Sequence, residues 1–225
     1  MTRRLRGVIW DIDGTLINSN DAHARSWVDA LSEAGVDVSF AQVRPLIGMG
    51  GDKLLPRLAG VEDDSPLGQR VSQRRAQIFK EQYLPSIRPF PKTRELLLRL
   101  KEWGLALAVA SSAKGEELAG FLDIAHVRDL IEQSTSSSDA ERSKPDPDIV
   151  QVALQKLGYQ PRDVIMVGDT PYDVEAASQL GVGAIALRSG GRSDADLAGA
   201  LAIYDHTADL LERLESSPLS PRNNG

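Results

Sequence analysis

The chain contains no cysteine among its 225 residues, which excludes disulfide bonds, thiolate metal ligands and a cysteine nucleophile. It also lacks a long apolar run, because the apolar stretch at residues 105–110 is far too short to cross a bilayer. Arg3, Arg4 and Arg6 precede a short apolar run that ends at Asp11, so we expect no secretory signal peptide. These absences favour a cytoplasmic protein that does not contact membranes.

An excess of basic charge is also missing, since the formal net charge is −6. Proteins that bind nucleic acids usually carry a basic face, so we expect no nucleic-acid partner. If the substrate is an anion, cations close to the site must offset the repulsion. The sequence shows no internal repeat, and its length suits one large domain or a core with a small insert.

Short apolar runs alternate with amphipathic stretches along most of the chain. Continuously apolar runs, which are typical of strands buried on both faces of a parallel sheet, lie at residues 7–10, 105–110, 164–167 and 183–187. Weaker strand candidates lie at residues 130–133 and 202–204. Helical patterns lie at residues 93–103, 147–157 and 172–180. The alternation predicts the α/β class, with a Rossmann-like, doubly wound parallel sheet.

Residues 18–85 differ from the rest because they contain no strand-like run. Four amphipathic patterns predict helices there, and Pro85, Pro89 and Pro91 mark the return to the sheet. We therefore expect an α/β core formed by residues 1–17 and 86–225, with a helical cap of residues 18–85 inserted after the first strand. The last ten residues are expected to be disordered.

Side chains with useful chemistry follow several of the predicted strands. The candidates are Asp11 and Asp13 after the first strand, Ser111 and Ser112 after the second, Lys144 before the helix at 147–157, and Asp169 and Asp173 after the strand at 164–167. In an open α/β sheet, ligands bind outside the carboxyl ends of the strands. We therefore expect these groups to meet at one edge of the sheet.

The types of these residues point to phosphate chemistry. Asp11 and Asp13 are two positions apart, so both side chains can face the same side, one as nucleophile and the other as proton donor and acceptor. Asp11, Asp169 and Asp173 together carry too much negative charge to lie beside a phosphate unaided. A hard dication such as Mg²⁺, bound by oxygen atoms, resolves this conflict.

Cations and hydroxyl groups complete the predicted site. Lys144 offers a point charge to a phosphate oxygen. Ser111 and Ser112 lie just before a helix expected to begin near Lys114, so both hydroxyl groups and free backbone N–H groups can face an anion.

Four segments resemble the motifs of the haloacid dehalogenase superfamily of phosphotransferases. They are DIDGT, the serine that ends LALAVASS, the lysine of SKPDP, and VGDTPYD, in the same order as in the family. The helical insert resembles the family's small α-helical cap, as in phosphoglycolate phosphatases and β-phosphoglucomutase-like members. Family members that are dehalogenases lack an aspartate at the position of Asp13, so the resemblance implies phosphoryl transfer.

The resemblance also implies a role for each residue. Asp11 would form an aspartyl-phosphate, Asp13 would act as general acid and then general base, and Ser111 and Lys144 would hold the phosphoryl group. Mg²⁺ would be bound by Asp11, by the backbone carbonyl of Asp13 and by Asp169. Asp173 would support the metal from behind or orient Lys144.

Cap residues are the candidates for substrate specificity. They are His23, Arg44, Gly48, Gly50 and Lys53, each of which can equally be a turn or packing residue. The segment at 47–53 is rich in glycine but lacks the Gly-Lys-Ser/Thr ending of a nucleotide-binding loop and follows no strand, so we exclude nucleotide binding there.

We therefore expect a Mg²⁺-dependent phosphatase that acts on a small phosphorylated metabolite. One alternative is a phosphomutase of the β-phosphoglucomutase kind, and another is a non-catalytic protein that binds phosphate esters. A phosphonoacetaldehyde hydrolase needs a cap lysine, and the surroundings of Lys53 do not match that pattern. The sequence leaves the substrate and the oligomeric state open.

Overall fold

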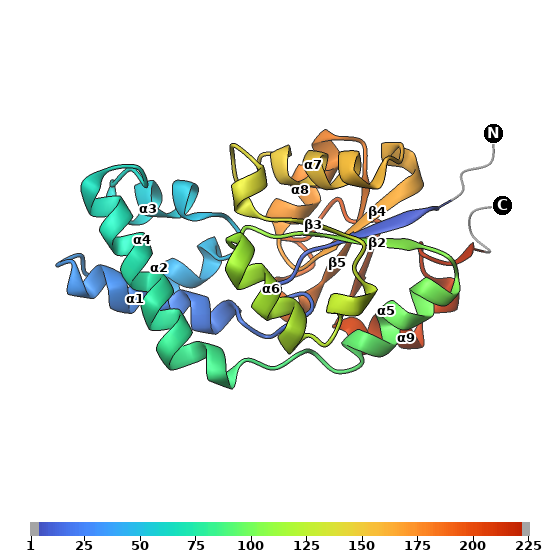
Figure 1. Cartoon of the computed structure of the whole chain (residues 1–225), viewed down its shortest axis with the longest axis horizontal. Helices are drawn as coiled ribbons and strands as arrows, with labels where there is room; N and C mark the ends of the chain where they lie inside the picture. Colours follow the sequence, from blue (N-terminus) through green and yellow to red (C-terminus); the bar gives the residue numbers. More distant parts are fainter. Residues whose placement is uncertain (1–4, 222–225) are drawn as a thin grey trace.

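The computed structural model describes residues 5–221, which form a six-stranded parallel sheet with helices on both faces (Figure 1). The strand order is β3-β2-β1-β4-β5-β6. The strands are β1 (Gly7–Trp10), β2 (Ala106–Ala110), β3 (Gln133–Thr135), β4 (Val164–Gly168), β5 (Gly183–Leu187) and β6 (Ala202–Tyr204). The predicted α/β class is therefore confirmed.

Alternate residues of the central strand β1 enter two different apolar clusters. Val8 and Trp10 belong to the cluster on one face, and Ile9 belongs to the cluster on the other. The first face is covered by α5 (Thr93–Glu102), α6 (Gly115–Ile124) and α9 (Thr207–Glu212), and the second by α7 (Asp148–Leu157) and α8 (Pro171–Gln179). Because both faces are buried, the strands are apolar throughout rather than alternating.

The chain between β1 and α5 is helical. It forms α1 (Asn20–Glu33), α2 (Phe40–Val43), α3 (Gly51–Ala59) and α4 (Pro66–Ile78), at the left of Figure 1. These helices pack around an apolar cluster of their own that includes Trp27, Leu54 and Val71. We call this segment the cap, and its exact limits stay a prediction. A π-helical turn at Phe79–Tyr83 continues α4, and the sequence did not indicate it.

The predictions for the third strand and the C-terminus need correction. Strand β3 begins at Gln133, because Leu130 closes the short helical turn Arg128–Leu130 instead. Leu219 is completely buried in the apolar cluster beneath β1, so the predicted disorder is wrong for residues 216–221, while residues 222–225 lie outside the described residues. Within residues 5–221, no helix combines the length and apolar character that crossing a bilayer requires.

Candidate active site

Three neighbouring strands end at the same level and deliver the predicted residues to one edge of the sheet. Trp10 at the end of β1 is in register with Val109 of β2 and Val167 of β4. The next residue, Asp11, donates its backbone N–H to the carbonyl of Val167 at 2.9 Å. The side chains that follow β1, β2 and β4 therefore meet, as the strand pattern predicted.

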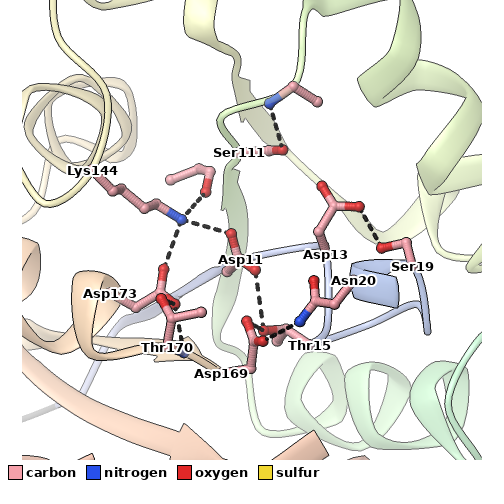
Figure 2. Close-up of polar contacts among 12 residues, drawn as sticks. Asp11, Asp13, Thr15, Ser19, Asn20, Ser111, Lys144, Asp169, Thr170 and Asp173 are labelled. Atoms are coloured by element: carbon pink, nitrogen blue, oxygen red, sulfur yellow. Dashed lines mark hydrogen bonds and ion pairs between the residues drawn. The ribbon is translucent and has the colours of Figure 1, made fainter. Parts of the chain in front are cut away.

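Lys144 reaches this group from one side, and its side-chain nitrogen lies between Asp11 and Asp173 (Figure 2). Its Nζ atom is 2.6 Å from Asp11 Oδ1 and 2.8 Å from Asp173 Oδ1, and it donates a hydrogen bond of 2.9 Å to the carbonyl of Ala110. Burial alone would lower the pKa of Lys144, but the charges of Asp11 and Asp173 outweigh it and raise that pKa. The side chain is thus a fixed, buried cation.

Asp173 connects Lys144 to the beginning of α8. Its Oδ2 atom accepts hydrogen bonds from the backbone N–H of Thr170 at 3.0 Å and from the Thr170 hydroxyl at 2.7 Å. The two residues form a capping box, in which each satisfies a free group at the helix start. Both oxygens of Asp173 are therefore occupied, which suits a residue that orients Lys144.

Asp169 is completely buried and closely surrounded. Its Oδ2 atom accepts a hydrogen bond of 2.7 Å from the Asn20 side chain, and its Oδ1 atom accepts one of 3.2 Å from Thr15. A Cβ atom added to Gly14 or Gly190 would lie 2.2 Å or 2.0 Å from Oδ2. Gly14 also has a φ of +79°, which glycine adopts most easily.

This arrangement leaves negative charge unbalanced. Asp11, Asp169 and Asp173 each place an oxygen within 4.8 Å of the others, and Lys144 is the ammonium among them. Burial, opposed by Lys144 and reinforced by the nearby carboxylates, raises the pKa of Asp11 to about 7. Burial and the neighbouring carboxylates also raise the pKa of Asp169 well above its usual value. Two uncompensated charges on oxygen ligands fit a hard divalent cation such as Mg²⁺.

Asp13 is held beside this cluster by residues of the cap. Its Oδ1 atom lies 2.8 Å from His23 Nε2 and accepts a hydrogen bond of 2.5 Å from the Ser19 hydroxyl. The His23 ring stacks on Phe79 with 4.1 Å between the ring centroids. Burial would raise the pKa of Asp13, but His23, Ser19 and the more distant Arg75 outweigh it and hold that pKa below its usual value.

The two predicted serines have different surroundings. Ser111 is fully buried, and its hydroxyl oxygen accepts a hydrogen bond of 3.1 Å from the backbone N–H of Ala113. Ser112 lines a cavity together with Asp11 and Asp13, and its hydroxyl has no hydrogen-bond partner among the described residues. Ser112 is therefore the serine with an unused hydroxyl at the cavity.

Three of the cap candidates line the same cavity. They are His23, Gly48 and Gly50. Gly48 has a φ of +112°, and a Cβ atom there would lie 2.7 Å from the Thr170 side chain. The cap backbone thus approaches the core closely beside the cavity, which explains a glycine at this position.

The other two candidates connect the cap to the core. Arg44 donates hydrogen bonds to the Asp21 carboxylate at 2.7 Å and to the carbonyl of Gly190 at 2.8 Å. Lys53 forms an ion pair of 2.7 Å with Asp146, two residues beyond Lys144. Neither Arg44 nor Lys53 lines the cavity that contains Asp11 and Asp13.

Several residues of the site could not be identified from the motifs. Ser19 and Asn20 bind the carboxylates of Asp13 and Asp169, and their nearness to DIDGT was the only signal. Arg75, which lines the cavity from α4, carried no sequence signal at all.

Comparison with known proteins agrees with this geometry. Residues 8–187 match the family model described as Haloacid dehalogenase-like hydrolase, so the chain belongs to this family. A phosphoglycolate phosphatase from Yersinia pseudotuberculosis is 30% identical over 219 residues, which cover 93% of each protein. The crystal structure of a hydrolase from Pseudomonas syringae superposes with a TM-score of 0.87 at 28% identity, covering 94% of this chain and 98% of that one.

A further relative is much longer than this chain. Protein SUPPRESSOR OF QUENCHING 1, chloroplastic, from Arabidopsis thaliana is 31% identical over 190 residues. The match covers 83% of this chain but only 18% of the plant protein. Together, the family and the phosphatases among the relatives support the predicted phosphatase enzyme.

Proposed function

We propose that the protein is a Mg²⁺-dependent phosphatase that hydrolyses a small phosphorylated metabolite through an aspartyl-phosphate on Asp11. The observation that carries this proposal is the pairing of Asp11 with the buried cation Lys144 at 2.6 Å, next to a cavity that both Asp11 and Asp13 line. Nucleophile, phosphate-binding cation and proton carrier are thus within reach of one ester.

In the first step, an oxygen of the Asp11 carboxylate attacks phosphorus and the bond from phosphorus to the ester oxygen breaks. The form of the enzyme that carries a proton on Asp13 is a minor one because the pKa of this residue is low. In this form Asp13 gives its proton to the departing oxygen, which leaves as an alcohol. Lys144 and the backbone N–H groups after β2 stabilise the charge on the transferring group. His23 and Ser19 hold the Asp13 side chain in place during this transfer.

In the second step, water attacks the phosphorus of the aspartyl-phosphate. Asp13, now a carboxylate, takes a proton from this water, and the bond between phosphorus and the Asp11 oxygen breaks. Inorganic phosphate leaves, and both aspartates return to their starting states.

Asp11 and Asp169 are the side chains we propose to hold Mg²⁺, with the backbone carbonyl of Asp13. When bound, the ion neutralises the carboxylates and the phosphate oxygens, so that the two can approach each other. Asp173 and Thr170 keep Lys144 in position from the beginning of α8.

A phosphomutase is the second candidate, and the contact between His23 and Asp13 favours it, because it adds a group that can tune proton transfer to a sugar hydroxyl. The two functions differ in whether water or a sugar accepts the phosphoryl group. The predicted cytoplasmic location and the absence of a nucleic-acid partner stay predictions.

Phosphate release from a panel of esters tests the proposal. The panel contains sugar phosphates, phosphoglycolate, nucleoside monophosphates and an aryl phosphate, each with Mg²⁺ and with a chelator. We expect release that the chelator abolishes and that Asp11→Asn eliminates. Isomerisation of a sugar phosphate without release would instead identify the mutase, and silence in both assays would leave a binding protein.

A further inference from the structure

Arg75, in the last turn of α4, has hydrogen-bond donors that nothing in the described chain uses. Its Nε and Nη1 atoms are buried and have no hydrogen-bond partner within residues 5–221. The nearest carboxylate is Glu117 of α6, whose Oε1 atom lies 3.8 Å from Nη1, beyond hydrogen-bond distance. The guanidinium also lies over the Trp27 ring at 5.2 Å, which restricts its orientation.

These donors lie where two cavities adjoin. Arg75, Ser112 and Glu117 line both the catalytic cavity, of about 70 Å³, and a second cavity of about 260 Å³ between the cap and the core. The Ser112 hydroxyl is also buried and has no hydrogen-bond partner in the described part of the chain. A guanidinium and a hydroxyl with unused donors therefore line both the cavity of the catalytic aspartates and the larger cavity.

The position of Arg75 assigns it to the leaving group rather than to the transferring phosphoryl group. Arg75 lines the catalytic cavity together with Asp13, the residue proposed to protonate the departing oxygen, and it also lines the larger cavity, which neither Asp11 nor Asp13 lines. The cation in contact with Asp11 is Lys144. A substrate with its phosphorus at Asp11 and its ester oxygen at Asp13 would therefore extend its organic part toward Arg75.

We propose that Arg75 and Ser112 form a subsite for a carboxylate on the leaving group, so that the substrate is a small phosphorylated carboxylic acid. This inference rests on the proposed phosphatase function. The planar guanidinium matches two carboxylate oxygens, and the free hydroxyl adds a third donor. The larger cavity is lined by four carboxylates and three cations, so a group with one negative charge fits better there than a second phosphate. The carboxylates are Asp52, Asp63, Glu117 and Glu141, and the cations are Arg75, Lys114 and Arg142.

Two matched esters test the subsite. In 2-phosphoglycolate the leaving group carries a carboxylate, and in 2-hydroxyethyl phosphate a neutral hydroxymethyl group takes its place. We expect the wild type to prefer the first ester in kcat/KM, and Arg75→Gln to reduce that preference at least about tenfold, the contribution of a charged hydrogen bond. Arg75→Lys should restore part of it. Arg74→Gln is the control, because Arg74 pairs with Glu33 on the surface at 2.6 Å.

An unchanged preference in Arg75→Gln, or an equal loss with both esters, would overturn the subsite while leaving the phosphatase intact. If the wild type releases phosphate from no ester, the proposed function fails, and calorimetric binding of the same two esters still tests the subsite. Tighter binding of 2-phosphoglycolate that Arg75→Gln removes would support it, and equal binding of both esters would refute it. Circular dichroism confirms that each variant is folded.

Discussion

At the scale of single residues, the confinement of Asp169 is a direct consequence of two glycines. Gly14 and Gly190 bring the backbone so close that any side chain at either position would collide with the Asp169 carboxylate. Asn20 and Thr15 hold the same carboxylate from other directions. A residue oriented this tightly is suited to bind a metal ion whose ligand geometry is strict.

Gly190→Ala tests whether this confinement serves metal binding. A Cβ atom there would lie 2.0 Å from Asp169 Oδ2 and 2.8 Å from its backbone oxygen, so Asp169 must shift. We expect the Mg²⁺ concentration for half-maximal activity to rise about tenfold or more, in the range measured for residues that orient metal ligands. Gly120→Ala on α6 is the control, since nothing lies within 4 Å of its added Cβ. An unchanged Mg²⁺ dependence in Gly190→Ala would contradict this role for Asp169.

The sequence predicted the site residues that directly follow strands better than the site residues that lie opposite them in the cap. Asp11 and Asp169 could be placed together because strand ends and residue type were both visible in the sequence. Arg75 could not, because its role depends on how α4 lies against the core, which no local pattern encodes. Ser112 shows the same limit, since the sequence favoured Ser111 as the serine at the phosphate, whereas Ser112 is the one that lines the cavity.

At the scale of elements, α3 of the cap contacts the loop that carries Lys144 on both sides of that residue. The backbone N–H of Gly50 donates to the Ser143 hydroxyl at 3.1 Å, and that hydroxyl donates to the Asp52 carboxylate. On the other side, Lys53 pairs with Asp146 at 2.7 Å. The position of the cap and the position of Lys144 are thus linked through α3 and the residue before it.

Lys53→Met should therefore weaken substrate binding more than it lowers the free energy of unfolding. The Lys53 and Asp146 side chains are about one third and one quarter exposed, so the ion pair contributes less than about 1 kcal/mol. We expect KM to rise by up to about fivefold with a smaller change in kcat, measured by steady-state kinetics. Lys92→Met, which removes a surface pair with Glu95 on α5, is the control. Equal effects of the two variants on KM would argue against the link.

The elements that the sequence predicted well are those with a strong apolar pattern. Strands β1 and β4 are continuously apolar because both faces are covered, and their positions were correct. Strand β3 reads Gln-Ser-Thr and gives no apolar signal, so the strand predicted at residues 130–133 begins three residues before β3. The π-helical turn after α4 begins at Phe79, whose ring stacks on His23, and the sequence displays neither the turn nor this contact.

At the scale of the whole molecule, the C-terminal segment completes the core. Leu219 has no exposed surface and belongs to the same cluster as Leu105 and Leu214. The serine and proline content of this segment suggested disorder, because composition does not reveal that one of its residues, a leucine, is buried. The C-terminal segment thus lies beside Leu5 and Leu105, which come just before the first residues of β1 and β2.

Leu219→Ala measures this contribution. Removing a buried leucine side chain costs about 2–5 kcal/mol, so we expect a clear loss of unfolding free energy in chemical denaturation. Leu201→Ala is the control, because Leu201 is 51% exposed and its truncation should change stability by less than about 0.5 kcal/mol. If both variants lost the same small amount, the segment would not be part of the core.

The central claim is that Asp11 becomes phosphorylated during turnover, and trapping that species tests it most directly. The enzyme would be mixed with a ³²P-labelled ester and Mg²⁺, quenched in acid within milliseconds, and digested for mass spectrometry. We predict label on the peptide that contains Asp11, lost on treatment with hydroxylamine and absent from Asp11→Asn. Rapid phosphate release with no labelled protein, or normal turnover by Asp11→Asn, would contradict the account.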